Sequence, residues 1–159
     1  EKIDLGELEI STIKRSDSEK YRMLYMDEKV NKYYGYDYKE DLTGEPTKEY
    51  FYNFQNGLKE KENEYSFAVK KNNELIGEVV CYNFDFDYSC EIGYRFFESF
   101  WGKGYATKSV TALIKTLNSF GIKTIKAKVI KGNEKSINLL KKLKFHFLKE
   151  DEKYIYFNL

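Results

Sequence analysis

The segment from Trp101 to Thr107 has the residue types of an anion-binding loop. It reads Trp-Gly-Lys-Gly-Tyr-Ala-Thr and runs directly into a predicted amphipathic helix. The first turn of a helix has unpaired N–H groups, and the helix dipole adds partial positive charge there. Gly102 and Gly104 let the backbone approach a bulky anion closely and adopt positive φ at little cost. The sequence therefore predicts a seat for a phosphorylated ligand.

Charge is distributed unevenly along the chain, although the formal net charge is only +1. Residues 1–100 carry 14 basic and 22 acidic side chains, whereas residues 101–159 carry 13 lysines and 4 acidic side chains. The predicted anion site thus lies at the start of the basic half of the chain, which suits an anionic ligand. A solvated surface of lysines would account for the same excess of basic residues. The lysines stand singly and no RNA-binding motif is present, so no nucleic-acid partner is expected.

Two familiar phosphate motifs fit this loop poorly. Nothing in the chain matches the P-loop pattern G-x-x-x-x-G-K-S/T. The dinucleotide fingerprint G-x-G-x-x-G/A fits Gly102 and Gly104, but Thr107 occupies its last position. A dinucleotide fold also begins with its glycine loop, whereas this loop follows three or four predicted strands. A nicotinamide-dependent oxidoreductase is therefore a disfavoured alternative.

The elements that must position the loop are predicted from periodicity. Alternation and turn residues predict strands at 8–12, 65–70, 75–83, 90–97, 125–129, 145–148 and 154–157, with a hairpin turn at Asn72-Asn73 between the second and the third. Helices are predicted at 16–26 and 46–61, from the glycine loop to a terminating Gly121, and from an N-cap at Asn133 to about residue 143, with a short helix and a loop within 27–45. This order indicates a mixed α/β sheet.

The loop and its surroundings resemble the GNAT family of N-acetyltransferases. That family's acetyl-CoA loop has Gln or Arg, two variable residues, Gly, one variable residue, and Gly or Ala. Gly104 and Ala106 stand at its defining positions, while Trp101 replaces the Gln or Arg. The phrases Glu91-Ile92-Gly93-Tyr94, Asn133-Glu134-Lys135-Ser136 and Leu143-Lys144-Phe145 resemble the branch that acetylates the N-terminal alanine of ribosomal proteins.

The resemblance implies one domain over residues 1–159, of α/β (α+β) class. Its mixed, mostly antiparallel, seven-stranded sheet would carry helices on both faces. The parallel strands around Glu91–Phe97 and Ile125–Val129 would splay to admit acetyl-CoA, with no metal. Cofactor contacts carried over by position are Tyr94, Arg95, Phe96, Trp101, Gly102, Lys103, Gly104, Tyr105, Ala106, Thr107, Asn133, Lys135 and Ser136.

The implied reaction transfers acetyl from acetyl-CoA to an amine by direct attack in a ternary complex. Asn133 and Ser136 would lie beside the thioester, with Ser136 bonding the thiolate; helix capping is the structural alternative for Ser136. Glu91 is the candidate base for the amine proton. The alternative is that Glu91 is a charged side chain on the face of the sheet, paired with a lysine. His146, the single histidine, is expected to be structural. Many relatives carry a tyrosine acid where this chain has Leu140, and a glycine where it has Lys144.

The acceptor is expected among residues 1–60, which vary in the family. Tyr33, Tyr34 and Tyr36 are the candidate substrate-binding residues, together with Glu91. Carboxylates of Asp37, Glu40 and Asp41 would attract a cationic amine, which tyrosine faces can also hold. A solvated acidic loop with packed tyrosines is the alternative.

The expected function is therefore an N-acetyltransferase acting on a small-molecule or peptide amine. A catalytically inactive acetyl-CoA-binding module is the main alternative. Cys81 and Cys90 are predicted to be buried reduced thiols, as in a cytoplasmic protein, rather than a cross-strand bridge. No apolar run approaches the roughly 20 residues of a membrane span, so no membrane partner is expected. Whether the chain forms a homodimer stays open.

Overall fold

The β-sheet is the framework of the molecule. The computed structural model describes residues 2–40 and 42–159. In these ranges eight strands form one sheet in the order β1-β2-β3-β4-β5-β6-β8-β7. The strands are β1 (Lys2–Asp4), β2 (Leu8–Thr12), β3 (Tyr65–Lys71), β4 (Glu74–Asp85), β5 (Ser89–Phe96), β6 (Thr124–Ile130), β7 (His146–Glu150) and β8 (Tyr154–Asn158). The mixed sheet is confirmed, and the count of seven strands falls short by one.

The strand missing from the prediction is β1, which forms one edge of the sheet. It has only three residues, too few for an alternation of polar and apolar side chains to be recognised. It pairs antiparallel with β2, with Ile3 opposite Ile10. The pairing is therefore set by the adjacent tight turn and not by a pattern within β1 itself.

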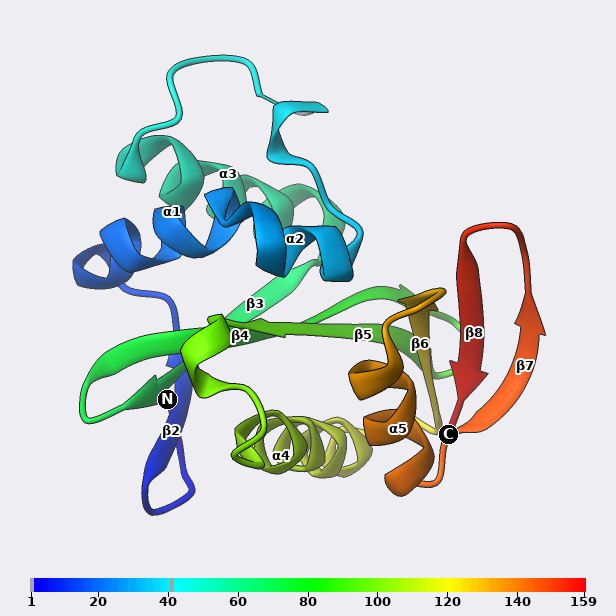
Figure 1. The fold of residues 1–159 in the computed structure, drawn as a ribbon. Helices are drawn as coiled ribbons and strands as arrows, with labels where there is room; N and C mark the ends of the chain where they lie inside the picture. Colours follow the sequence, from blue (N-terminus) through cyan, green and yellow to red (C-terminus); the bar gives the residue numbers. More distant parts are fainter. Residues whose placement is uncertain (1, 41) are drawn as a thin grey trace.

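The helices lie on both faces of the sheet (Figure 1). Helices α1, α2 and α3 cover one face, and α4 and α5 cover the other. Their bounds are α1 (Ser18–Met26), α2 (Glu28–Tyr34), α3 (Lys48–Glu62), α4 (Tyr105–Ser119) and α5 (Glu134–Lys142). Helix α3 begins after the N-cap Thr47, whose side chain accepts a hydrogen bond from Tyr50, so Pro46 precedes the helix instead of lying in its first turn.

Two local predictions for chain reversals are confirmed. Asn72 and Asn73, between β3 and β4, have φ of 51° and 64° and form a tight hairpin. Gly121 follows the end of α4 with φ of 90°. The apolar stripe of α4 is buried at Val110, Leu113 and Leu117. Helix α4 is thereby fixed against the sheet directly after the glycine loop.

The only parallel strand pair that the described residues form is short and then opens. β5 and β6 are in register over three positions, from Ser89 opposite Thr124 to Glu91 opposite Lys126. Beyond Glu91 the two strands no longer pair, and β6 continues its pairing with β8 up to Ile130. The predicted splay is confirmed, and it opens the sheet where β5 approaches the glycine loop.

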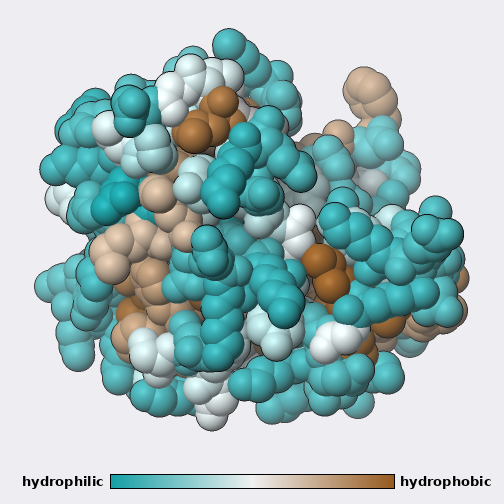
Figure 2. All heavy atoms as spheres, turned by 45° about the horizontal axis from the view of Figure 1, so that its top comes forward, coloured by the Kyte–Doolittle hydropathy of each residue, from teal (hydrophilic) through white to brown (hydrophobic). Residues whose placement is uncertain are grey.

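The surface and the interior match the composition. Most of the face seen in Figure 2 is hydrophilic, and apolar surface is confined to separate patches. Cys81 and Cys90 are both buried and reduced, as predicted. No helix within the described ranges combines the length and the apolar character needed to cross a bilayer.

Lys144 occupies a position that favours glycine. Its φ is 71°, and its N–H donates to Lys141 O while the N–H of Phe145 donates to Leu140 O. These two bonds form the Schellman motif that ends α5. The turn therefore holds an exposed lysine in the left-handed region, which glycine adopts at little cost.

Lys144→Gly is expected to raise the free energy of unfolding by about 1 kcal/mol, because a non-glycine residue in this region is strained. Thermal denaturation should show an increase of roughly 2–4 °C in the midpoint. The control is Lys142→Gly in the last turn of α5, which should destabilise by about 1 kcal/mol. Equal destabilisation by both variants would show that Lys144 is not strained.

Candidate functional site

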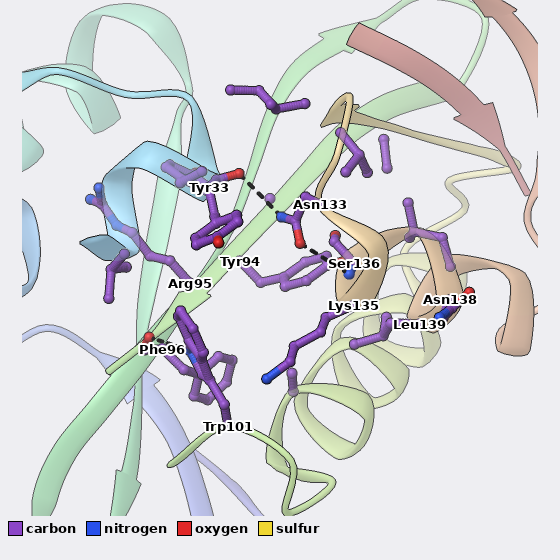
Figure 3. Close-up of a pocket in the computed structure, with 18 of the residues that line it drawn as sticks. Tyr33, Tyr94, Arg95, Phe96, Trp101, Asn133, Lys135, Ser136, Asn138 and Leu139 are labelled. Carbon is purple, nitrogen blue, oxygen red and sulfur yellow. Dashed lines mark hydrogen bonds between the residues drawn. The ribbon is translucent and has the colours of Figure 1, made fainter. Parts of the chain in front are cut away.

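A cavity of about 920 Å³ occupies the gap between β5 and β6. Its walls come from α2, β5, the loop before α4, β6 and the first turns of α5. Figure 3 shows side chains from these elements converging on the open sheet. The cavity arises because β5 and β6 separate after Glu91, which leaves a space that no neighbouring strand fills.

The glycine loop forms one end of this cavity. Gly102 and Gly104 have φ of 73° and 79°, and a Cβ built on either would meet nothing within 4 Å. Helix α4 has no acidic residue in its first turn and no side-chain cap at Gly104. No described residue accepts a hydrogen bond from the N–H groups of residues 102–107. These donors and the helix dipole make the loop a seat for an anion, as the sequence predicted.

Trp101 braces the loop against the end of β5. Its indole Nε1 donates to Phe96 O at 2.8 Å, the bond drawn in Figure 3. Its ring also meets Tyr33 edge-on, with centroids 6.0 Å apart, and Lys135 Nζ lies 5.1 Å from its centroid. A large aromatic residue therefore connects the loop, α2 and α5.

At the start of α5, three polar side chains line the same cavity. Asn133 Oδ1 accepts from the Ser136 backbone N–H at 3.3 Å, and Asn133 Nδ2 donates to Tyr33 O at 3.1 Å. The Ser136 hydroxyl takes no part in this cap. It lies 2.5 Å from the Tyr94 hydroxyl, which reaches it from β5. Asn133 is thus the helix cap, and the Ser136 and Tyr94 hydroxyls form a separate pair facing the cavity.

The Tyr94 hydroxyl is protonated at neutral pH, as in an ordinary tyrosine, and burial strengthens its hold on the proton. Desolvation raises the pKa of Tyr94 to about 12, although its hydrogen bond with Ser136 acts in the opposite direction. A protonated phenol beside a serine hydroxyl can donate a proton to a group bound near α5.

Most predicted cofactor residues line the cavity. These are Tyr94, Arg95, Phe96, Trp101, Gly102, Gly104, Tyr105, Ala106, Thr107, Asn133, Lys135 and Ser136. Lys103 does not: it is exposed, with its Nζ 5.8 Å from the Phe100 ring centroid. Its role as a phosphate contact remains a prediction.

The guanidinium of Arg95 is directed away from the glycine loop. Its Nε and Nη2 both lie 2.7 Å from Glu78 Oε1, and its Nη1 donates to Asn31 Oδ1 at 2.5 Å. Rings of Tyr25 and Tyr34 lie 4.4 and 4.8 Å from the guanidinium carbon. Burial opposes the charged form, but Glu78 and the tyrosines outweigh it and raise the pKa of Arg95. Arg95 therefore ties α2 to the sheet, and only its backbone remains a candidate cofactor contact.

Comparison with known proteins decides the family. The profile of the acetyltransferase (GNAT) domain matches residues 7–146. The chain belongs to the GNAT family.

Known relatives agree with this assignment. An uncharacterized N-acetyltransferase p20 of Bacillus licheniformis is 37% identical over 90 residues, which are 55% of this chain and 51% of that protein. The chain thus spans about half the length of this curated relative. Among solved structures, RimL, a ribosomal-protein α-N-acetyltransferase in complex with coenzyme A, has a TM-score of 0.84 at 17% identity, over 100% of this chain and 97% of that one. Spermidine N-acetyltransferase of Vibrio cholerae, in complex with CoA and spermine, has a TM-score of 0.81 at 16% identity, over 96% and 95%.

On the opposite side of this GNAT cavity lie the tyrosines predicted to bind the acceptor. Tyr33, Tyr34 and Tyr36 all line it. Gly93 lets Tyr34 lie directly on β5, since a Cβ at residue 93 would come within 2.8 Å of the Tyr34 hydroxyl. The structure thus places all three tyrosines in one wall.

The acidic loop predicted to accompany these tyrosines lies elsewhere. Asp37 and Glu40 are not among the lining residues, and Asp41 lies outside the described residues. Glu91 is also absent from the lining, and its carboxylate accepts a hydrogen bond from Asn83 Nδ2. His146 is exposed on β7 and is not among the lining residues, and its predicted structural role stays a prediction.

Several carboxylate- or hydroxyl-bearing residues near the site were not predicted. Tyr82, Glu98, Glu134 and Tyr154 line the large cavity, and Glu64 and Glu78 line a smaller one beside it. Glu78 had a usable signal, because an acidic residue within the apolar run of β4 is buried only with a partner. Glu64 had none, since it lies at the end of a charged helical segment that resembles a solvated surface.

Proposed function

We propose that this protein is an acetyl-CoA-dependent N-acetyltransferase that acetylates a primary amine by direct attack in a ternary complex. One observation carries the proposal. The cavity in the splayed sheet has an unpaired helix N-terminus at one end and the Tyr94–Ser136 hydroxyl pair in its wall. An anion seat and a proton donor thus lie within one space, bordered by tyrosines that can hold an amine.

The described residues fit acetyl-CoA. The N–H groups of residues 102–107 would bind the pyrophosphate, and the free edge of β5 beyond Glu91 would pair with the pantetheine arm as a neighbouring strand would. Lys135 is placed to meet a phosphate near Trp101. Acetyl-CoA, when bound, supplies an activated acetyl thioester.

The Tyr94–Ser136 pair is the proposed proton source for the leaving thiolate. Ser136 would donate its hydroxyl proton to the sulfur and take one from Tyr94, and the Tyr94 phenolate, made more basic by burial, would regain its proton from solvent. Tyr94 on β5 would thereby supply the acid that many relatives place where this chain has the buried Leu140. Asn133 would fix the position of the first turn of α5, and hence of Ser136, relative to Tyr33.

The acceptor amine must lose a proton before it attacks, because an alkylamine is mostly protonated at pH 7. Glu91 remains the candidate base. Since its carboxylate binds Asn83 and does not line the cavity, it would act through intervening water.

Tyr94→Phe and Ser136→Ala are each expected to lower kcat by about tenfold. This effect is small for the loss of a general acid, because a thiolate whose thiol has a pKa near 8.5 is already a good leaving group. The affinity for acetyl-CoA should change by less than about threefold, since one hydrogen bond contributes roughly 1 kcal/mol or less. Steady-state rates and calorimetric binding separate the two quantities. An unchanged kcat in both variants would leave the pair as a contact between β5 and α5 only.

The function itself is tested by release of free coenzyme A thiol over a panel of small amines and peptides. Acetyl-CoA should bind, and at least one class of amine should produce acceptor-dependent thiol. Tight binding of acetyl-CoA with no acceptor-dependent thiol would favour the inactive binding module. A protein N-terminus and a small amine are both candidates, since the structural relatives include a ribosomal-protein acetyltransferase and a spermidine acetyltransferase.

A further inference from the structure

A second cavity, of about 220 Å³, adjoins the acceptor side of the large one. Both cavities are lined by Tyr34, Tyr36, Tyr82 and Arg95. The smaller one extends from these shared residues between α1, α3 and strand β4 of the sheet. The two cavities therefore adjoin at these four side chains.

The smaller cavity carries an unbalanced negative charge. Its charged lining residues are Glu64, Glu78 and Arg95. Glu78 and Arg95 neutralise each other, with Arg95 Nε and Nη2 both 2.7 Å from Glu78 Oε1. No described residue forms an ion pair or hydrogen bond with the carboxylate of Glu64. The net charge of the lining is thus that of Glu64.

Glu64 is held in this place by backbone contacts. Its carbonyl accepts from Gln55 Nε2 at 3.3 Å, and its N–H donates to Leu58 O at 3.3 Å. Gln55 is itself buried and accepts a hydrogen bond from Tyr21. The carboxylate is therefore presented from a fixed junction between α3 and β3.

The location is unfavourable for a carboxylate in the free protein. Desolvation, followed by the charges of Glu78 and Glu62, raises the pKa of Glu64, and Arg95 only partly offsets this. The residue also follows the C-terminus of α3, where the helix dipole disfavours negative charge. A cation bound in the cavity would remove these costs. A carboxylate placed where its charged form is disfavoured is typical of a functional position.

The remaining walls suit an organic cation. Phe54, Tyr25 and Tyr82 add aromatic surface, and Tyr25 already contacts the Arg95 guanidinium at 4.4 Å. Aromatic faces together with a partly desolvated carboxylate favour an alkylammonium group over a neutral chain end. The volume suits a short alkylammonium arm, since one water molecule occupies about 30 Å³ of liquid.

We propose that the small cavity binds a second cationic group of the acceptor at Glu64, so that the preferred acceptor is a short diamine. One amine would be acetylated in the large cavity while the other is held at Glu64. This inference rests on the proposed acetyltransfer function and specifies its acceptor. Glu64 is then a specificity-determining residue, whereas the acetyl-CoA site does not depend on it.

The test compares 1,4-diaminobutane with butylamine, and with longer α,ω-diamines, in the thiol-release assay. The wild-type kcat/KM for the best diamine should exceed that for the monoamine of equal length by about tenfold or more. Only the diamine has a second ammonium group that can form a partly buried ion pair with Glu64. Glu64→Gln should abolish this preference and leave the kcat/KM for butylamine and the KM for acetyl-CoA unchanged. Glu62→Gln, at the exposed end of α3 and outside the cavity, is the matched control and should keep the preference.

Two kinds of failure are distinguishable. Equal rates for diamines and monoamines, or equal losses for both in Glu64→Gln, would overturn the inference while acetyltransfer stands. If no amine yields thiol, the proposed function fails, and calorimetry of 1,4-diaminobutane binding to the wild type and to Glu64→Gln still tests the cavity. Equal binding to both proteins would then overturn the inference as well.

Discussion

Glu78→Gln is expected to lower the free energy of unfolding by about 3–5 kcal/mol, because it leaves a charged guanidinium buried without its counter-ion. Glu78 is 1% exposed and Arg95 is 5% exposed. Glu78 holds the two Arg95 nitrogens through Oε1 and accepts from Ser66 through Oε2. A loss of this size is a large part of the about 5–15 kcal/mol that stabilises a typical domain. Chemical denaturation measures it directly.

The matched control is Glu74→Gln at the start of the same strand. Glu74 pairs with Lys20 at 2.7 Å, but both side chains are about half exposed, at 53% and 43%. Its removal should cost less than about 1 kcal/mol. If Glu78→Gln does not fold, the double variant Glu78→Leu/Arg95→Met tests the same point, since replacing both charges by apolar groups should restore folding. A loss below about 1 kcal/mol in Glu78→Gln would show that the pair is not a buried ion pair in solution.

This pair also illustrates what sequence reasoning could not supply. Glu78 and Arg95 are 17 residues apart and meet because β4 and β5 place them directly opposite each other. A shift of one residue in that register would move each side chain to the other face of the sheet. Each charge could be recognised as unusual within its own apolar strand, but the partner depended on a register that no local pattern specifies.

Predictions that rested on local backbone geometry were confirmed. The Asn72–Asn73 turn, the end of α4 at Gly121 and the Asn133 cap each depend on a few consecutive residues, and the structure forms all three. Longer-range expectations fared less well. The acids chosen to accompany the acceptor tyrosines were neighbours in sequence, whereas the carboxylates that share a cavity with those tyrosines come from distant segments: Glu98 and Glu134 in the large cavity, and Glu64 and Glu78 in the small one. Proximity in sequence is therefore a poor guide to which charges share a cavity.

Lys144 and Trp101 show how the fold absorbs departures from a family pattern. Lys144 retains the glycine conformation at a cost in strain, because the Schellman bonds and the burial of Phe145 impose that geometry. Trp101 replaces a polar residue but makes a new hydrogen bond to Phe96 and packs on Tyr33. The glycine loop is thereby braced against α2, which carries Tyr33.

Gly104→Val is expected to weaken acetyl-CoA binding by about 100-fold. The side chain would enter space that is now open within 4 Å and lies against the unpaired N–H groups of α4. Loss of two charge-assisted hydrogen bonds to a pyrophosphate, at roughly 1.5 kcal/mol each, corresponds to this factor. Isothermal titration with acetyl-CoA provides the measurement.

Gly121→Val separates this effect from backbone strain. Gly121 lies at the opposite end of the same helix, has φ of +90°, and also has nothing within 4 Å of a built Cβ. Both substitutions should therefore cost about 1–3 kcal/mol of stability, because valine is strained at positive φ. Only Gly104 lines the cavity, so only Gly104→Val should weaken binding. Parallel losses of affinity in the two variants would mean that α4 is simply destabilised, and unchanged affinity in both would refute the loop as the pyrophosphate seat.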